Sequence, residues 1–178
     1  PLPRWAGPAL MVAGALLLLF FLGLPIYLYF FAPPPIFENL LHLHIHDFSE
    51  FLGTTPSEDG WFSYPRLPLY WEEAGRAAFL IRAAGCLAGF ALISRGSLIS
   101  GNPEVSDVSE FFVVRGLRRR GVGGAAAHAL FGTAPGVWEV RVIDSNQPAQ
   151  RFWPPVIERY TSGHFTVEPW TRDDGSRW

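Results

Sequence analysis

The sequence predicts a mixed α/β (α+β) fold, with helices on the faces of one sheet. Two observations support this class. From residue 36 onward, segments with a 3.6-residue apolar period alternate with short apolar runs of strand length. Two of those runs, Phe79–Arg82 and Leu87–Ser94, are separated by a short turn that contains Gly85, which is the signature of a β-hairpin. The predicted order is helix, short helix, hairpin, strand, helix, strand, helix and strand.

Two helical segments precede the hairpin. Behind the rigid break at Ala32–Pro35, apolar residues recur with a helical period at Ile36, Leu40, Leu41, Leu43 and Phe48. The polar, turn-rich stretch Gly53–Gly60 predicts a loop. Leu67–Ala74 predicts a short helix that ends at Gly75.

The elements after the hairpin follow in close succession. We predict a loop at Gly101–Pro103, a strand at Val108–Arg115, a glycine-rich loop at Gly116–Gly124, a helix at Ala125–Phe131, a strand at Trp138–Ile143, a helix at Gln147–Tyr160 and a last strand at His164–Trp170. Pro154 and Pro155 fall inside the penultimate segment, and a proline in a helix interior costs about 3 kcal/mol. They predict a kink or a late start of that helix.

Residues 1–35 form an apolar segment in front of the domain that we assign to residues 36–178. No charged residue occurs from Ala6 to Phe31, and this stretch exceeds the roughly 20 residues that a helix needs to cross a bilayer. One interpretation is a transmembrane helix, which makes the membrane a partner through residues 6–31. Another is that the apolar run ends before Pro25 and a strand follows at Ile26–Phe31, whose Tyr and Phe favour β-structure. A signal peptide is less favoured, because a clear small-residue cleavage site is missing.

Composition excludes several classes of chemistry. The 178 residues carry a net charge of -2, so nothing global draws the chain to nucleic acid. All fourteen basic residues are arginine, which excludes a lysine nucleophile. Cys86 is the only cysteine, so the chain cannot form an internal disulfide.

The most informative local pattern is the strand, glycine loop and helix from Val108 to Phe131. The first N–H groups of a helix have no intrahelical partner, and the helix dipole favours an anion there. Glycine lets a phosphate approach the backbone, and arginine adds charge-assisted hydrogen bonds. The pattern is not a P-loop, because it lacks the Gly-Lys-Ser/Thr ending, and its glycine spacing does not fit a dinucleotide fingerprint. A solvated turn is the structural alternative.

Arg118-x-x-Gly121-x-Gly123 resembles the acetyl-CoA motif of the GNAT superfamily of N-acetyltransferases. Val108–Arg115 resembles the central strand of that family, and Trp138–Ile143 resembles the next, parallel strand. Further on, the sequence resembles the family's Asn-x-x-Ala-x-x-Phe-Tyr helix pattern at Asn146, Ala149, Phe152 and Trp153. The resemblance implies a mixed, mostly antiparallel sheet with a splayed central strand and flanking helices, here preceded by an apolar N-terminal helix.

The resemblance also implies an N-acyltransferase. It would move an acetyl group from acetyl-CoA, a co-substrate, to a small-molecule or peptide amine by direct attack, without a metal. The backbone of Val113, Val114 and Arg115 would pair with pantetheine. The pyrophosphate would lie on Arg118, Arg119, Arg120, Gly121, Val122, Gly123, Gly124 and Ala125, and Asn146, Phe152 and Trp153 would flank the arm. Since acetyl-CoA is a cytoplasmic metabolite, we expect a cytoplasmic catalytic domain, whether or not the N-terminal segment anchors it to a membrane.

Glu110 is the candidate general base, because it lies early in the central strand, where this family often has an acid. An exposed strand-end carboxylate is the alternative. Trp153 stands where many members have a tyrosine proposed as the general acid, and an indole does not protonate a thiolate. This departure supports a rival hypothesis, a non-catalytic acyl-CoA-binding module attached to a membrane. A third hypothesis is a membrane protein whose soluble part only binds protein partners. This hypothesis does not explain the glycine loop.

Two further groups of polar residues have a functional and a structural interpretation. His42 and His46 share a helix face and have the spacing of metal ligands. A third ligand is not obvious, because His44 points elsewhere, so we prefer to interpret them as part of an ordinary polar helix face. Glu72 and Glu73 lie where the family shapes its acceptor site, and would bind a cationic amine or be solvated.

Overall fold

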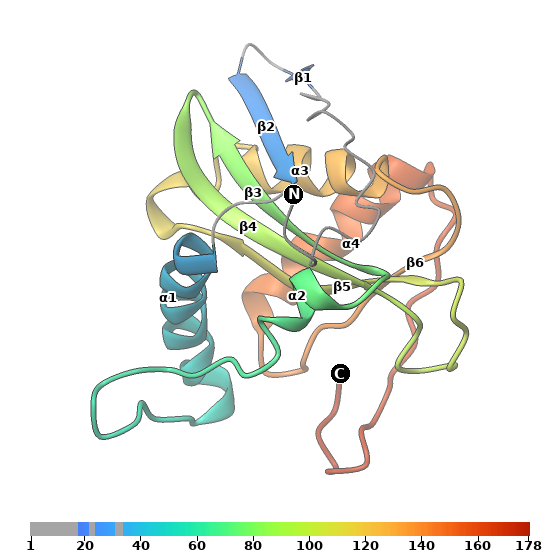
Figure 1. Ribbon diagram of the computed structural model, residues 1–178. Helices are drawn as coiled ribbons and strands as arrows, with labels where there is room; N and C mark the ends of the chain where they lie inside the picture. Colours follow the sequence, from blue (N-terminus) through green and yellow to red (C-terminus); the bar gives the residue numbers. More distant parts are fainter. Residues whose placement is uncertain (1–17, 22–23, 31–33) are drawn as a thin grey trace, which may run out of the picture.

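The computed structural model describes residues 18–21, 24–30 and 34–178, and its core is a twisted sheet (Figure 1). The strands are β1 (Leu18–Phe21), β2 (Leu24–Phe30), β3 (Arg76–Ala83), β4 (Cys86–Arg95), β5 (Ser106–Val113) and β6 (Trp138–Val140). They lie side by side in chain order. Every neighbouring pair is antiparallel except β5 and β6, which run parallel. The mixed, mostly antiparallel sheet predicted from the sequence is confirmed.

Helices cover both faces of the sheet (Figure 1). They are α1 (Pro34–Leu52), α2 (Leu69–Glu72), the 3-10 turn η1 (Arg115–Leu117), α3 (Val122–Phe131) and α4 (Gln147–Thr161). Phe37 and Leu41 of α1 pack with Leu80 of β3, whereas the adjacent Phe79 packs with Leu130 of α3. Successive side chains of a strand point to opposite faces. One face of the sheet therefore carries α1 and α2, and the other carries α3 and α4.

The central strand β5 diverges from β6 after three residue pairs. Its pairing with β6 runs only from Ser106–Trp138 to Val108–Val140, although β5 continues to Val113. On its other side it pairs with β4, and there Ser109 is an extra residue between Val108 and Glu110. Such a bulge kinks a strand and re-aims the side chains beyond it. The splayed central strand is thus present, and the bulge lets Val108 pack towards α3 and α4 while Glu110 lies on the face of α1.

Element boundaries shift by a few residues from the sequence predictions; β5, predicted at Val108–Arg115, spans Ser106–Val113. Helix α3 begins at Val122, three residues before the predicted start, so Gly123 and Gly124 lie inside its first turn. Strand β6 ends at Val140 rather than Ile143, because the chain there bends away from β5. The last predicted strand, 164–170, is wrong. In its place the C-terminal residues fold back on themselves, and the amide and carbonyl groups of Trp170 and Trp178 pair with one another.

The described part of the apolar N-terminal stretch is β-structure rather than helix. Residues 18–21 and 24–30 form β1 and β2, in agreement with the alternative of a strand beginning near Pro25. The remainder of the predicted span, in residues 6–17, 22–23 and 31, lies outside the described residues. Within the residues that are described, no helix has the length and apolar character needed to cross a membrane.

Candidate active site

A large open cleft runs along the unpaired end of β5, between α1 on one side and the start of α3 on the other. Its volume is about 2560 Å³. Pockets for one small ligand usually measure about 300–1,000 Å³. The cleft is therefore large enough for two substrates at once. Both Glu110 and the predicted cofactor loop line it.

The cofactor loop presents unpaired backbone N–H groups to this cleft. Gly121 caps α3 with a left-handed backbone (φ +80°), which glycine adopts without steric cost. The Ala125 amide donates to the Gly121 carbonyl, so the preceding amides of Val122, Gly123 and Gly124 are the orphan donors of the first turn, and α3 has no side-chain cap. Arg119 also has a positive φ of 59°, an unusual conformation that tends to persist where a loop is shaped for a ligand. This arrangement of backbone donors is the one that helix N-termini use to bind anions.

Two arginines of the loop, although exposed, form ion pairs with α1. Arg115 and Arg118 both donate to the carboxylate of Asp47, over 2.9 and 2.6 Å, and Arg118 Nε also donates to the Val113 carbonyl at 2.6 Å. Burial alone would raise the pKa of Asp47, but the hydrogen bonds from Arg115 and Arg118 hold it below its usual value. Arg119 and Arg120 are exposed and form no ion pair within the described residues. They are the loop side chains free to meet phosphate.

The remaining predicted cofactor residues shape the wall behind the loop. Phe152 of α4 stacks on Phe111. A Cβ on Gly123 would lie only 3.1 Å from the Phe152 ring, so glycine at this position lets α3 lie close to α4. Asn146 accepts a hydrogen bond from the Ala149 amide and caps α4. Trp153 is only 7% exposed and packs against Phe111. The helix α4 runs through Pro154 and Pro155 without interruption.

The unpaired edge of β5 offers backbone groups to an extended ligand. The Val114 amide donates to the Ala88 carbonyl of β4. Residues facing one another across an antiparallel pair alternate between bonded and non-bonded pairs. The backbone groups of Val113 therefore point to the opposite edge, where β6 has already diverged. There the Val113 carbonyl already accepts from Arg118 Nε, so the Val113 amide is the group left for a ligand. This edge fits the strand-like pairing that an amide-containing arm requires.

Glu110 lies at the centre of a polar cluster on the α1 face of the sheet. The Tyr64 hydroxyl donates to one carboxylate oxygen at 3.0 Å, and His44 Nε2 lies 2.9 Å from the other, where an ionised carboxylate accepts its hydrogen. Glu110 keeps 25% of its side chain exposed to the cleft. Each carboxylate oxygen has a second lone pair. Glu110 is thus fixed in orientation and still able to accept a proton from a ligand.

Burial and the neighbouring carboxylate keep the two tyrosines of this cluster neutral. Burial raises the pKa of the Tyr64 hydroxyl far above its usual value, and the negative charge of Glu110 raises it further. Burial likewise raises the pKa of Tyr70, despite a hydrogen bond with Ser109. Tyr64 therefore remains a hydrogen-bond donor to Glu110 throughout the physiological pH range.

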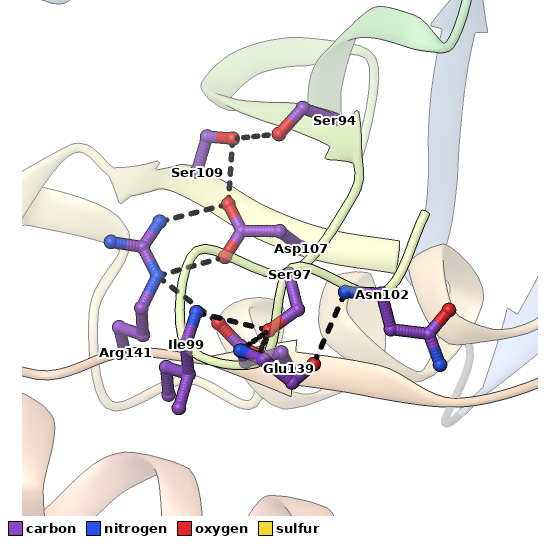
Figure 2. A network of polar contacts seen from close by, with 9 residues as sticks. Ser94, Ser97, Ile99, Asn102, Asp107, Ser109, Glu139 and Arg141 are labelled. Atoms are coloured by element: carbon purple, nitrogen blue, oxygen red, sulfur yellow. Dashed lines mark hydrogen bonds and ion pairs between the residues drawn. The ribbon is translucent and has the colours of Figure 1, made fainter. Parts of the chain in front are cut away.

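The other carboxylates near β5 are already committed to structure (Figure 2). Asp107 is 1% exposed and accepts hydrogen bonds from Arg141 over 2.9 and 3.0 Å, and from Ser109 over 2.8 Å. Glu139 of β6 accepts a 2.6 Å hydrogen bond from Ser97. These contacts join the loop after β4 to β5 and β6. Asp107 is buried in an ion pair and Glu139 does not line the cleft, whereas Glu110 keeps part of its side chain exposed to it.

The model of the acetyltransferase (GNAT) family matches residues 37–154 of the chain, which include most of α1, the whole of β5, the cofactor loop and Glu110. The chain belongs to the GNAT acetyltransferase family. A search of curated proteins found no significant match to the sequence.

Solved structures of GNAT proteins share the fold. An acetyltransferase from Thermus thermophilus superposes with a TM-score of 0.59 at 18% identity, covering 84% of this chain and 92% of its own. An aminoglycoside acetyltransferase from an uncultured soil metagenomic sample, in complex with sisomicin, gives 0.54 at 16% identity, covering 83% and 92%. AAC(6')-Iy, in complex with the bisubstrate analog CoA-S-monomethyl-acetylneamine, gives 0.51 at 17% identity, covering 83% and 98%.

The GNAT fold brings Glu110 together with residues that the sequence did not point to. The sequence argues against His44 as a ligand, because it does not share a face with His42 and His46. That same difference turns it inward, where it is 8% exposed and contacts Glu110. Tyr64 lies in a stretch with no motif, and only its tertiary position reveals it.

Two other side chains that the sequence analysis singled out form contacts within the protein. His42 accepts a hydrogen bond from the Phe62 amide, and Glu73 forms an ion pair with Arg76. Among the described residues, no group of three or more His, Cys, Asp and Glu side chains is arranged to hold a metal.

Proposed function

We propose that this GNAT domain transfers an acetyl group from acetyl-CoA to a primary amine by direct attack, with Glu110 as the general base. The amine nitrogen forms a bond to the thioester carbonyl carbon, and the carbon–sulfur bond breaks. The proton lost from nitrogen passes to Glu110. CoA leaves as a thiolate and takes a proton from water, because Trp153 cannot supply one.

One observation carries the proposal. A partly exposed carboxylate, held by Tyr64 and His44, lines the same cleft as a helix N-terminus with three orphan amides. The amides and the helix dipole favour the CoA pyrophosphate, with Arg119 and Arg120 as added charges. The open edge of β5 at Val113 then directs the pantetheine arm from the loop towards Glu110. Asn146, Phe152 and Trp153 support this path through α4.

The structural neighbours support an amine as the acceptor. AAC(6')-Iy was solved with an analog that joins CoA to an acetylated neamine, and the soil-sample aminoglycoside acetyltransferase was solved with sisomicin. At 16–17% identity they share only the fold with this chain, so we carry over the use of an amine and not the aminoglycoside itself.

A non-catalytic acyl-CoA-binding module is the second candidate, and Trp153 is the observation that favours it. Trp153 lies in the core between Phe111 and Phe131, so no acid stands at that position. Both candidate functions predict that the domain binds acetyl-CoA, but only the acetyltransferase predicts release of the CoA thiol.

The deciding experiment measures thiol release from acetyl-CoA by the full chain, with and without a panel of primary amines. The proposal expects amine-dependent release that Glu110→Gln abolishes. Glu50→Gln is the matched control, because Glu50 is another exposed carboxylate of the cleft that forms no hydrogen bond within the described residues. Binding of acetyl-CoA without release under any amine would establish the non-catalytic module instead.

A further inference from the structure

The wall of the cleft opposite the cofactor loop is aromatic. It is formed by α1 and the segment after it, and we call it the aromatic wall: Phe48, Phe51, Trp61, Phe62 and Tyr64. The ring centroids of Phe48 and Phe51 lie 5.7 Å apart, and Phe48 lies 5.5 Å from His44. His44 and Tyr64 in turn contact Glu110. The aromatic wall therefore leads directly to the proposed base.

Trp61 is exposed and at the same time fixed in place. It is 43% exposed, and its ring stacks on His42 with centroids 4.2 Å apart. Its carbonyl accepts hydrogen bonds from the Ser57 amide and hydroxyl, and the next amide, of Phe62, donates to His42 at 3.2 Å. A rigid aromatic side chain binds a ligand at low entropic cost. Leu52, 50% exposed, extends the apolar surface at the end of α1.

The charges of the cleft do not suit a polycation. Eleven arginines and six carboxylates line it. Asp47, Glu73 and Asp107 are already paired with arginines. Glu50, Glu110 and Asp174 remain, and they share the cleft with seven arginines that form no ion pair within the described residues. Each additional ammonium group would therefore meet net positive charge. A ligand with one ammonium group needs only Glu110.

We infer that the acceptor is a primary amine with a single positive charge, carried on an apolar, aromatic-sized body that lies on the aromatic wall. This inference rests on the proposed function and names its substrate class. The ring of the ligand contacts Trp61 and Phe62, and its amine reaches Glu110. An aminoglycoside, whose body is polar and whose amines are several, is the wrong ligand on both counts.

Three amines compared on the full chain test the inference: 2-phenylethylamine, ethanolamine and sisomicin. We expect kcat/KM for 2-phenylethylamine to exceed the other two by about tenfold or more, because the burial of one aromatic ring strengthens binding by at least that factor. Comparable or higher kcat/KM for sisomicin would overturn the inference and leave the proposed function intact. Binding of acetyl-CoA with no acetylation of any amine would overturn both.

A variant pair locates the preference. Trp61→Ala is expected to raise KM for 2-phenylethylamine several-fold and to leave KM for acetyl-CoA unchanged. Val137→Ala is the control, because Val137 is 66% exposed and lies outside the cleft. Trp61→Phe keeps a ring on His42 and should retain most of the preference, which separates a lost contact from a misfolded segment. An unchanged KM for 2-phenylethylamine in Trp61→Ala would contradict the placement of the acceptor.

Discussion

The two sides of the cleft are built in different ways. The proposed cofactor side consists of adjacent residues from Arg115 to Ala125, and the groups that we propose as ligands are mostly backbone amides at the start of α3. The acceptor side is assembled from distant residues, since His44 and Tyr64 lie 66 and 46 positions from Glu110. A backbone site depends on local conformation, which glycine and helix signals specify. A side-chain site depends on how the whole domain packs.

This difference predicts that the two sides fail separately. Damage to the cofactor side should weaken binding of CoA, and damage to the acceptor side should slow the chemical step. Asp47 is the point where the two sides meet, because it lies on α1 and holds Arg115 and Arg118 of the loop.

The largest effect is expected on the acceptor side. Glu110→Gln keeps the hydrogen bond from Tyr64 but removes the proton acceptor, and general base catalysis typically contributes about 10²–10⁴-fold. We expect kcat to fall by about 100-fold or more and the dissociation constant of CoA to stay within about twofold. Steady-state kinetics and calorimetry on the same preparation provide both numbers. Full turnover in the variant would assign the base to a water or another carboxylate.

The next effect is expected on the cofactor side. Gly121→Val places a β-branched residue at φ +80° and a Cβ where phosphate must approach, so we expect CoA affinity to fall by about tenfold or more. Gly163→Val is the matched control, because Gly163 has φ +85° and lies outside the cleft. Gly163→Val introduces a similar backbone strain at a position away from the proposed phosphate site. An equal loss of CoA affinity in both variants would show that strain, and not the phosphate site, is responsible.

A smaller effect separates the arginines of the loop. Arg120 has no ion pair within the described residues, whereas Arg115 is held by Asp47. Arg120→Gln should weaken CoA binding by about threefold, and the loss should shrink at high salt because exposed charges are screened. Arg115→Gln should change CoA affinity less and thermal stability more. CoA affinity would be measured by titration at two salt concentrations. A larger loss of affinity in Arg115→Gln than in Arg120→Gln would contradict the roles that we assign from the ion pairs.

The smallest effect concerns the junction between the two sides. The pKa of Asp47 lies below its usual value in the folded protein, so its ion pairs stabilise the fold above the ordinary carboxyl pKa and are lost as pH falls through the folded value. Asp47→Asn should therefore lower the melting temperature by about 2 °C at neutral pH, and the difference from wild type should disappear at an acidic pH below the folded pKa of Asp47. A melting difference that is the same at both pH values would exclude this ionisation as its source.

The same contrast explains what the sequence could predict. The hairpin, the central strand and the cofactor loop follow from apolar runs, glycines and helix signals that lie close together in the chain. The bulge at Ser109 has no such signal, yet it decides that Glu110 faces α1. The predicted strand at 164–170 failed because apolar and aromatic content alone does not provide a partner strand.

Side-chain pairings were the least predictable feature. The three histidines of α1 are equivalent by composition, and only packing places His44 on Glu110 and His42 on Trp61. The arginines of the loop all suggest phosphate, but two of them contact a carboxylate contributed by a helix about 70 residues earlier in the chain. Charge pattern alone could not tell which of these arginines would be neutralised.

The most direct test of the separation between the two sides measures two quantities on the same two variants. The dissociation constant of CoA and the kcat with a primary amine that the wild type acetylates are determined for Glu110→Gln and Gly121→Val beside wild type. We predict a crossed pattern, with kcat lost and affinity kept in Glu110→Gln, and affinity lost with kcat at saturating acetyl-CoA largely kept in Gly121→Val. If both variants lost both quantities together, the cleft would act as one coupled unit, and the assignment of binding and chemistry to separate sides would be wrong.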